Sequence, residues 1–421
     1  MEPDEHLFRR EAGRITTALT RIFGVHNLAL VEDVVQDAFC RALETWRIRG
    51  VPDNPSAWLM TTAKRRAIDV LRRERTARTF APELERRFES EWTLVPTVDE
   101  IFDARAIRDD QLRMMFSCCH PRLSEQAQVA LVLHLLCGFS VREIASAFLS
   151  GHAATEKRIT RAKKLLSTSR RLFELTDRDF AARLAAVHRA LYLLFNEGYH
   201  GASPEAAVRT ELCREAMRLS GFLLDQPLAA TPATHALCAL MHFQAARLPA
   251  RVDAVGNLNS LFDQNRSHWD KHLAAKGRKL LELSASGPDL TAYHIEAAIA
   301  AEHACAPRVE ETDWRRIVSL YDSLMVIRPS PVVALNRAIA IGQLEGPERG
   351  LAAMRAIDDR TRLADYPFYA AALGELELRI GRCEAARKHF DSARALARND
   401  MERRFLDGRI EACGVHAAVP K

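Results

Sequence analysis

The stretch from Phe139 to Leu166, FSVREIASAFLSGHAATEKRITRAKKLL, constrains the fold of this chain more than any other segment. Ser140 and Glu143 have the spacing of a capping box, in which each side chain bonds the backbone N–H of the other at a helix start. Gly151 interrupts the helical pattern and supplies the backbone freedom that a sharp turn needs. Apolar residues then recur at helical spacing from Ala154 onward. The segment therefore predicts two short helices joined by a tight turn.

The second helix of this pair is basic, and Glu156 is its only acidic residue. A helix-turn-helix places such a helix in a DNA major groove, with its early residues at base edges and its later cations on phosphates. An ordinary helical hairpin with a solvated charged face has the same pattern, so the motif alone leaves both interpretations open. The residues expected to contact DNA are Thr155, Glu156, Lys157, Arg158, Thr160, Arg161 and Lys164.

Length and composition favour a soluble, cytoplasmic protein. A chain of 421 residues predicts two or three domains, and a net charge of +5 is small for this length, so any DNA-binding surface must be local. The 9 cysteines are dispersed without a C-x-x-C pair, which is typical of reduced, buried thiols. We expect no signal peptide and no membrane contact, because no apolar run approaches the ~20 residues of a membrane span.

Residues 1–78 carry three helical patterns. The second, Leu28–Trp46, has an inward stripe of Val and Ala and an acidic opposite face, which suits a basic partner surface or is simply solvated. A loop rich in Gly and Pro follows at residues 47–55, and the helix Ser56–Arg73 ends in cations. A basic helix beside aromatic residues suits single-stranded DNA. Trp58 is expected to anchor the core, whereas Trp46 fits either role.

Two segments in this order, VEDVVQDAFCRALETW and VPDNPSAWLMTTAKRRAIDVLRR, resemble region 2 of bacterial extracytoplasmic-function (ECF) sigma factors, and the helix-turn-helix resembles their region 4. The resemblance implies a subunit that directs core RNA polymerase to promoter DNA, not an enzyme. It implies that region 2 docks on the coiled coil of the polymerase β′ subunit and opens the −10 element. Region 4 would read the −35 element and touch the β flap.

The same resemblance assigns residues to these roles. Family members often carry Asn where this chain has Arg65, a departure that bears on the −10 sequence preference. The residues implied for polymerase binding are Glu32, Asp33, Gln36, Asp37 and Phe39. Those implied for −10 binding are Trp46, Asn54, Lys64, Arg65, Arg66, Arg72 and Arg73.

The middle of the chain is predicted to connect two DNA-binding modules. Residues 79–108 are acidic and are interrupted by Pro82 and Pro96, which predicts a flexible linker before the region 4 module at residues 109–172. Cys118, Cys119 and His120 are zinc-ligand types, but adjacent cysteines do not easily serve one tetrahedral site and no matching pair follows. We therefore expect no metal and no other cofactor.

Residues 173–421 are predicted to be helical throughout, which makes the whole chain all-α. Within residues 290–400, small and large residues recur near the period of about 34 residues of tetratricopeptide repeats, with the large residue at Tyr321, Met354 and Phe390. An unspecialised helical bundle is the alternative. Such repeats present a concave surface to a peptide or protein, so a protein partner is expected there.

The segments LYLLFNEGYH (191–200) and LFDQNRSHWDKHL (261–273) resemble the sigma-factor group with a tetratricopeptide-like C-terminal extension, sometimes called ECF42 or YlaC-like. Because this extension follows the basic helix closely, we expect it to modulate promoter activity. An alternative is a helix-turn-helix regulator controlled by a peptide-sensing repeat domain, which leaves residues 28–75 without a role. An enzyme is disfavoured: there is no phosphate loop, and His268 and His272, four apart, have no evident third metal ligand.

Overall fold

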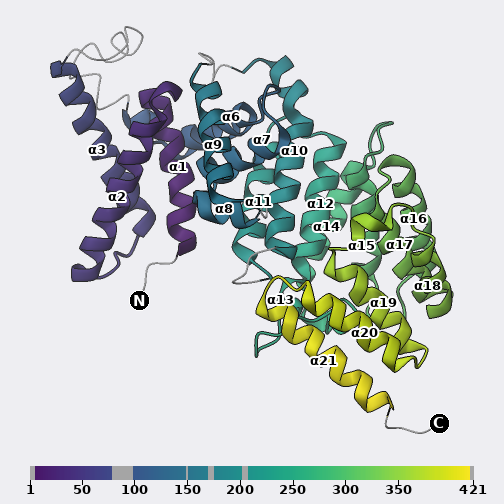
Figure 1. Ribbon diagram of the computed structural model, residues 1–421. Coiled ribbons are helices and arrows are strands. Elements are labelled where there is room, and N and C mark those ends of the chain that lie inside the picture. The colour runs from purple at the N-terminus through teal and green to yellow at the C-terminus, as the bar shows by residue number, and fades with distance from the viewer. Residues whose placement is uncertain (1–4, 78–97, 148–149, 169–174, 202–206, 418–421) are drawn as a thin grey trace. The chain divides into compact units, whose positions relative to one another are not determined.

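The computed structural model describes residues 5–77, 98–147, 150–168, 175–201 and 207–417, so residues 79–97 of the predicted linker lie outside the described residues. Within these ranges the regular elements are all helices, and the β pairing is an isolated bridge between Val252 and Leu258, which confirms the all-α fold class. The chain divides into two compact units (Figure 1). The first comprises Met1–Leu194 with Asp225–Ala229, and the second Phe195–Leu224 with Ala230–Lys421.

The first unit is built from short and medium helices around a core at its N-terminal end. Its elements are α1 (Glu5–Phe23), η1 (Val25–Asn27), α2 (Leu28–Arg49), α3 (Pro55–Ala77), α6 (Ala104–Cys118), α7 (Glu125–Leu131), the π-helical turn η2 (Val132–Leu136), α8 (Val141–Ala147), α9 (His152–Ser167) and the larger part of α10 (Asp177–His200). The predicted stripe on α2, including Val31, Val34 and Ala38, is buried against α1 and α3.

The capping box predicted for the first helix of the helix-turn-helix is present, but the backbone conformation predicted for the turn is not. Ser140 N donates to Glu143 Oε2 over 2.8 Å, and Glu143 N donates to Ser140 Oγ over 3.3 Å, so the capping box is present. Gly151 has an ordinary extended backbone with φ of −64°, so the expectation that the turn uses its freedom is wrong. The glycine that needs this freedom is Gly138, whose φ is +68° and whose added Cβ would lie 2.9 Å from the carbonyl oxygen of Arg9.

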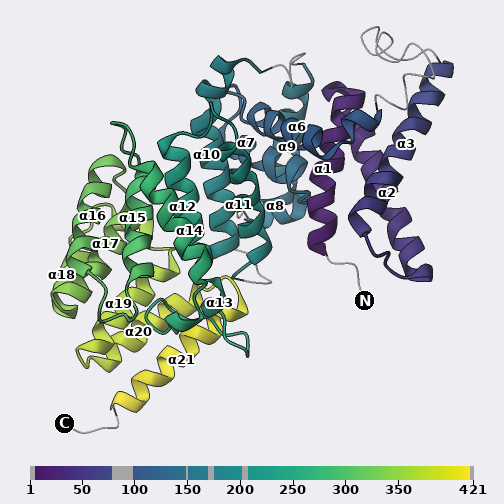
Figure 2. The same cartoon turned by 180° about the vertical axis from the view of Figure 1, so that it is seen from behind.

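The second unit stacks helices in chain order. Its elements are α11 (Thr210–Leu224), α12 (Pro232–Ala246), α13 (Leu248–Arg251), η3 (Arg266–His268), α14 (Lys271–Ser284), α15 (Ala292–Cys305), α16 (Trp314–Ile327), α17 (Pro331–Leu344), α18 (Pro347–Arg355), η4 (Arg360–Leu363), α19 (Pro367–Arg379), α20 (Cys383–Ala395) and α21 (Asp400–Ala417). Helix α12 is enclosed by α11, α14 and α15 (Figure 2).

From α15 to α21 each helix packs against the next one along the chain. Met354 and Phe390, two of the large residues that the repeat interpretation singled out, are fully buried, and Tyr321 packs against the core beside Leu324. Sequential pairing of helices is typical of repeat proteins. The tetratricopeptide assignment itself stays a prediction.

Candidate nucleic-acid interface

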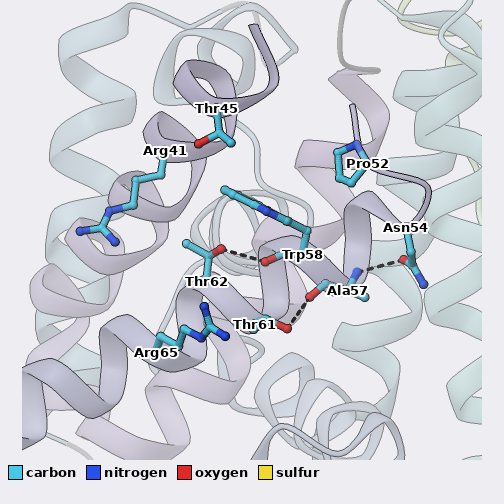
Figure 3. Close-up of a pocket in the computed structure, with 9 residues that line it drawn as sticks. All are labelled: Arg41, Thr45, Pro52, Asn54, Ala57, Trp58, Thr61, Thr62 and Arg65. Carbon is cyan, nitrogen blue, oxygen red and sulfur yellow. Dashed lines mark hydrogen bonds between the residues drawn. The ribbon is translucent and has the colours of Figure 1, made fainter. Parts of the chain in front are cut away.

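A pocket of about 560 Å³ opens between α2 and the start of α3 in the first unit (Figure 3). Pockets that hold small molecules have volumes of ~300–1,000 Å³, so a single nucleobase is within reach of this one. Figure 3 shows the indole of Trp58 among hydroxyl groups and two guanidinium groups. The lining residues are Arg41, Thr45, Pro52, Asn54, Ala57, Trp58, Thr61, Thr62 and Arg65.

Local hydrogen bonds fix the wall of this pocket. Asn54 Oδ1 accepts a hydrogen bond from Ala57 N over 3.0 Å and so caps the first turn of α3. Thr61 Oγ1 donates to the carbonyl of Ala57 over 2.8 Å, and Thr62 Oγ1 donates to the carbonyl of Trp58 over 2.9 Å. These bonds fix the first turns of α3, and the pocket they border also carries one aromatic ring and two cations, groups suited to stacking a base and binding a phosphate.

Both tryptophans pack on the core of the first unit, and Trp58 also lines the pocket. Trp46 is 5% exposed, with its ring centroid 5.6 Å from Phe8 and 5.5 Å from Trp58, so it is a core residue without a free stacking face. Its burial disfavours contact with −10 DNA, and that assignment stays a prediction. Trp58 packs on the same core but also lines the pocket. The sequence pattern missed Trp58, Arg41 and Thr61 as pocket residues, because a pocket depends on contacts between elements.

The cations of α3 divide into two groups. Arg66 pairs with Asp37 of α2 over 2.8 Å, and Lys64 pairs with Asp99. The sequence assigned Asp37 to polymerase binding, and Asp99 lies in the predicted linker. The remaining predicted cations lie on exposed positions of the helix: Arg65, Arg72 and Arg73.

Helix α9 presents a polar, largely cationic face. Ile159, Ala162 and Leu166 are buried at the helical spacing predicted for the inner face. Thr155 is fully buried, and its Oγ1 lies 2.7 Å from Ser150 Oγ, so it ties α9 to the preceding turn. This burial disfavours contact with DNA, and that assignment stays a prediction. Arg158 is half-buried. The exposed members of the predicted set are Glu156, Lys157, Thr160, Arg161 and Lys164.

The polymerase-binding residues assigned to α2 occupy different surroundings. Asp33 and Gln36 are exposed, whereas Phe39 packs against Phe8 with ring centroids 5.1 Å apart. Glu32 Oε1 accepts a hydrogen bond from Lys163 of α9 and lies 3.1 Å from His134 Nε2. Two elements from distant parts of the chain therefore meet at Glu32, which local sequence patterns do not reveal.

This contact between α2 and α9 belongs to a wider interface within the first unit. Arg9 of α1 pairs with Glu143 of α8, and its Cζ lies 4.8 Å from the ring centroid of Phe139. Gly13 of α1 approaches η2 so closely that an added Cβ would lie 1.8 Å from the carbonyl oxygen of Leu136. The α1–α3 module thus packs directly on the helix-turn-helix module.

The pKa of Glu32 predicts how this interface responds to acid. Burial by itself raises the pKa of Glu32, but the hydrogen bonds and charges of His134 and Lys163 outweigh it and hold the pKa below the ordinary 4.5. A carboxylate with a lowered pKa stabilises the folded state above its ordinary pKa, and this contribution is lost as pH falls through the lowered value.

We therefore expect Glu32→Gln to lower the free energy of unfolding by about 1 kcal/mol at pH 7, because the pair is partly exposed and screened. The difference between variant and wild type should shrink as the pH falls below about 4.5, where the Glu32 carboxylate becomes protonated first in the unfolded state and then, at lower pH, in the folded state. Urea unfolding between pH 3 and pH 7 measures both values. A difference that does not change across this range would contradict the assignment.

Cys118 and Cys119 are buried thiols at the end of α6, and burial raises the pKa of Cys119 to about 12. In the described ranges, no three residues among His, Cys, Asp and Glu gather into a set that could hold a metal ion. None of the described helices combines the length and apolar character needed to cross a bilayer.

Comparison with protein families identifies the two modules of the first unit. Residues 7–77 match the model of sigma-70 region 2, and residues 113–166 match that of sigma-70 region 4, which together define a sigma factor. Residues 183–285 match a family of unknown function, DUF6596. The exposed helix α9 and the pocket at α3 lie inside the two sigma-70 matches.

The ECF RNA polymerase sigma factor SigK of Mycobacterium sp. (strain KMS) is 30% identical over 36% of this chain and 74% of its own length. The chain therefore belongs to the family of ECF RNA polymerase sigma factors. The uncharacterized protein R00370 of Rhizobium meliloti (strain 1021) is 40% identical over 96% of this chain and 94% of its own length. No solved structure matches the chain.

Proposed function

We propose that this sigma factor opens the −10 element of its promoters with the pocket between α2 and α3, and reads the −35 element with α9. The pocket carries the first half of the proposal, because it combines the ring of Trp58 with the guanidinium groups of Arg41 and Arg65. Stacking of one unpaired base on an aromatic ring contributes about 1–3 kcal/mol. That contribution offsets the cost of unpairing, which is a few kcal/mol.

The second half of the proposal rests on the exposed face of α9. Glu156 and Lys157 lie in the early turns, where a recognition helix meets base edges, and Arg161 and Lys164 lie further along, where cations meet phosphates. Each module alone would bind DNA weakly. Core polymerase would hold both on one promoter and so raise their effective concentration.

We propose that the exposed part of α2, which includes Asp33 and Gln36, binds the coiled coil of the polymerase β′ subunit. Both side chains are exposed, and an acidic surface suits a basic partner. Contact of the α8–α9 module with the β flap is proposed from the family resemblance. Glu32 meets Lys163 and His134 through one carboxylate oxygen, and its side chain is partly exposed, so it is the member of the proposed docking surface that also contacts α9.

The test is transcription by core polymerase supplemented with the purified chain, with start sites mapped across a genome-derived template library. Core with the chain should initiate at a defined promoter set that core alone does not use. Arg65→Ala should bind core normally but form open complexes about tenfold less often, since a lost contact from arginine to a base costs about 1–3 kcal/mol. Arg214→Ala, an exposed cation on α11, is the matched control. Binding to core no stronger than that of an unrelated protein would refute the proposal.

We also propose that the second unit modulates this activity, and that the chain belongs to the ECF42 group. The truncation that tests it should end at Leu194 rather than at residue 172, where the sequence places the domain boundary. The ring of Phe180 lies 4.5 Å from that of Phe116, and Arg183 donates to the carbonyl of Phe116, so the first part of α10 covers α6 within the first unit. The truncated chain should retain core binding and change its promoter output. Unchanged output would contradict a regulatory role.

A further inference from the structure

Three arginines of the second unit are enclosed without a carboxylate partner. Arg247 ends α12 and is 8% exposed, Arg266 in η3 is 9% exposed, and Arg251 in α13 is partly buried. Over the described ranges, no ion pair joins any of them to Asp or Glu, although most arginines in this unit have one. Buried charges in proteins are ordinarily paired, because removing a cation from water costs free energy.

Aromatic rings separate these cations. The Cζ of Arg251 lies 4.3 Å from the ring centroid of Tyr199, and the Cζ of Arg247 lies 5.8 Å from the same centroid. On the other side, Arg247 and Arg266 lie 5.5 Å and 5.0 Å from the ring centroid of Trp269. The order is therefore Arg251, Tyr199, Arg247, Trp269, Arg266. Ring faces attract cations, but they do not satisfy the N–H groups of a guanidinium.

The hydrogen bonds distinguish a structural arginine from the other two. Arg266 donates to the carbonyls of His303 and Ala306 and to Thr312 Oγ1, so it fastens the loop after α15. In the described part of the chain, the guanidinium of Arg247 donates one hydrogen bond, from Nη1 to Gln244 Oε1 over 3.2 Å. Arg251 donates from Nη2 to His200 Nδ1 over 3.3 Å. Arg247 and Arg251 thus keep N–H groups that the fold does not use.

The polar atoms left unpartnered around this pair are mainly donors. The Nε atoms of Arg247 and Arg251 and the hydroxyl of Tyr199 are buried and have no hydrogen-bond partner. Tyr199 is itself 2% exposed. Native proteins leave few such groups, and an ion or ligand that occupies the site is one common explanation. A cluster of unused donors around two cations requires an acceptor that carries negative charge.

The electrostatics agree with this requirement. Burial, together with the charges of Arg247 and Arg266, lowers the pKa of His303 to about 3, so this neighbour is neutral at pH 7 and adds no cation. Burial and the charge of Arg251 lower the pKa of Arg247 as well. The two like charges repel each other, and an anion that accepts hydrogen bonds from both guanidinium groups would offset this repulsion.

We propose that Arg247 and Arg251, with the hydroxyl of Tyr199, form a binding site for the phosphate or carboxylate group of a small soluble ligand. Guanidinium groups recognise both oxyanions through paired N–H···O bonds. Arg251 is only partly buried, so the ligand would enter at its end of the cluster, with Arg247 at the inner end. This site goes beyond promoter recognition and does not depend on it, since every residue in it belongs to the second unit.

The experiment titrates the full-length chain with inorganic phosphate and, separately, with citrate, at constant ionic strength set by chloride. Saturable binding in calorimetry is expected for at least one anion, with a rise in the unfolding temperature of about 5 °C at an anion concentration of 100 times Kd. Binding of phosphate alone would identify phosphorylated ligands, and binding of citrate alone would identify carboxylates. Binding of neither would overturn the proposal.

Matched variants locate the site. Arg251→Gln and Arg247→Gln should each weaken binding at least tenfold, whereas Arg278→Gln, an exposed cation on α14, should leave it unchanged. Arg251 lies at the partly exposed end, so its variant is expected to fold even if the Arg247 variant does not. If Arg278→Gln weakens anion binding equally, the effect is one of general charge and the proposed site is overturned. If Arg251→Gln binds the anion as tightly as the wild type does, the proposed site is overturned as well.

Discussion

Replacing Lys157, Arg161 and Lys164 together with Ala is expected to weaken promoter binding by the polymerase complex at least 100-fold at moderate salt. All three side chains lie on the exposed face of α9, so the core of the helix-turn-helix stays intact. Each cation that neutralises a phosphate contributes about −0.9 to the slope of log K against log salt. Loss of three phosphate contacts should therefore make that slope shallower by about 2.7.

The measurement is a salt titration of promoter binding with polymerase assembled on each variant. A control of equal charge change is Lys271→Ala, Arg278→Ala and Lys279→Ala on α14, whose side chains are also exposed. This control should keep the wild-type slope. A slope that changes equally in both triple variants would show that net charge, and not the face of α9, sets DNA affinity.

Gly13→Ala is expected to lower the free energy of unfolding of the first unit by about 3 kcal/mol, the upper part of the usual range for overpacking. The new Cβ would lie 1.8 Å from the carbonyl oxygen of Leu136 and 2.6 Å from its carbonyl carbon. Both are backbone atoms, so no side-chain rotation relieves the clash, and α1 must move away from η2. Urea unfolding gives the free energy, and small-angle scattering detects the separation as a larger radius of gyration.

Gly221 on α11 is a control glycine, for which substitution by Ala is expected to raise the free energy of unfolding instead of lowering it. An added Cβ at Gly221 in α11 meets nothing within 4 Å, and Ala is favoured over Gly in a helix interior by about 1 kcal/mol. Gly221→Ala should therefore stabilise the protein slightly. If Gly13→Ala behaves in the same way, the close approach of α1 and η2 is not present in solution.

Local pattern was enough to predict the helices and the buried stripes, as the capping box at Ser140 and the inner face of α9 illustrate. These features depend on residues three or four positions apart. The burial of Trp46, the pairing of Glu32 with Lys163 and the stacking of Arg247 between two rings depend on contacts between segments far apart in the chain. A solvated face and a docked one have the same sequence pattern, so those contacts required the structure.

The bond from Lys163 to Glu32 has a consequence for how many molecules of this sigma factor are available to polymerase. On the proposed function, α3 and α9 read elements whose numbering differs by about 25 base pairs, or about 85 Å at 3.4 Å per pair. Modules whose side chains touch cannot occupy both places at once. On the proposed function, only molecules in which this interface is open can recognise a promoter. The apparent affinity for promoter DNA is then the affinity of the open form multiplied by the fraction of molecules that are open. On the proposed function, the contacts at Arg9, Gly13 and Glu32 would therefore keep part of the sigma factor in a form that cannot recognise a promoter.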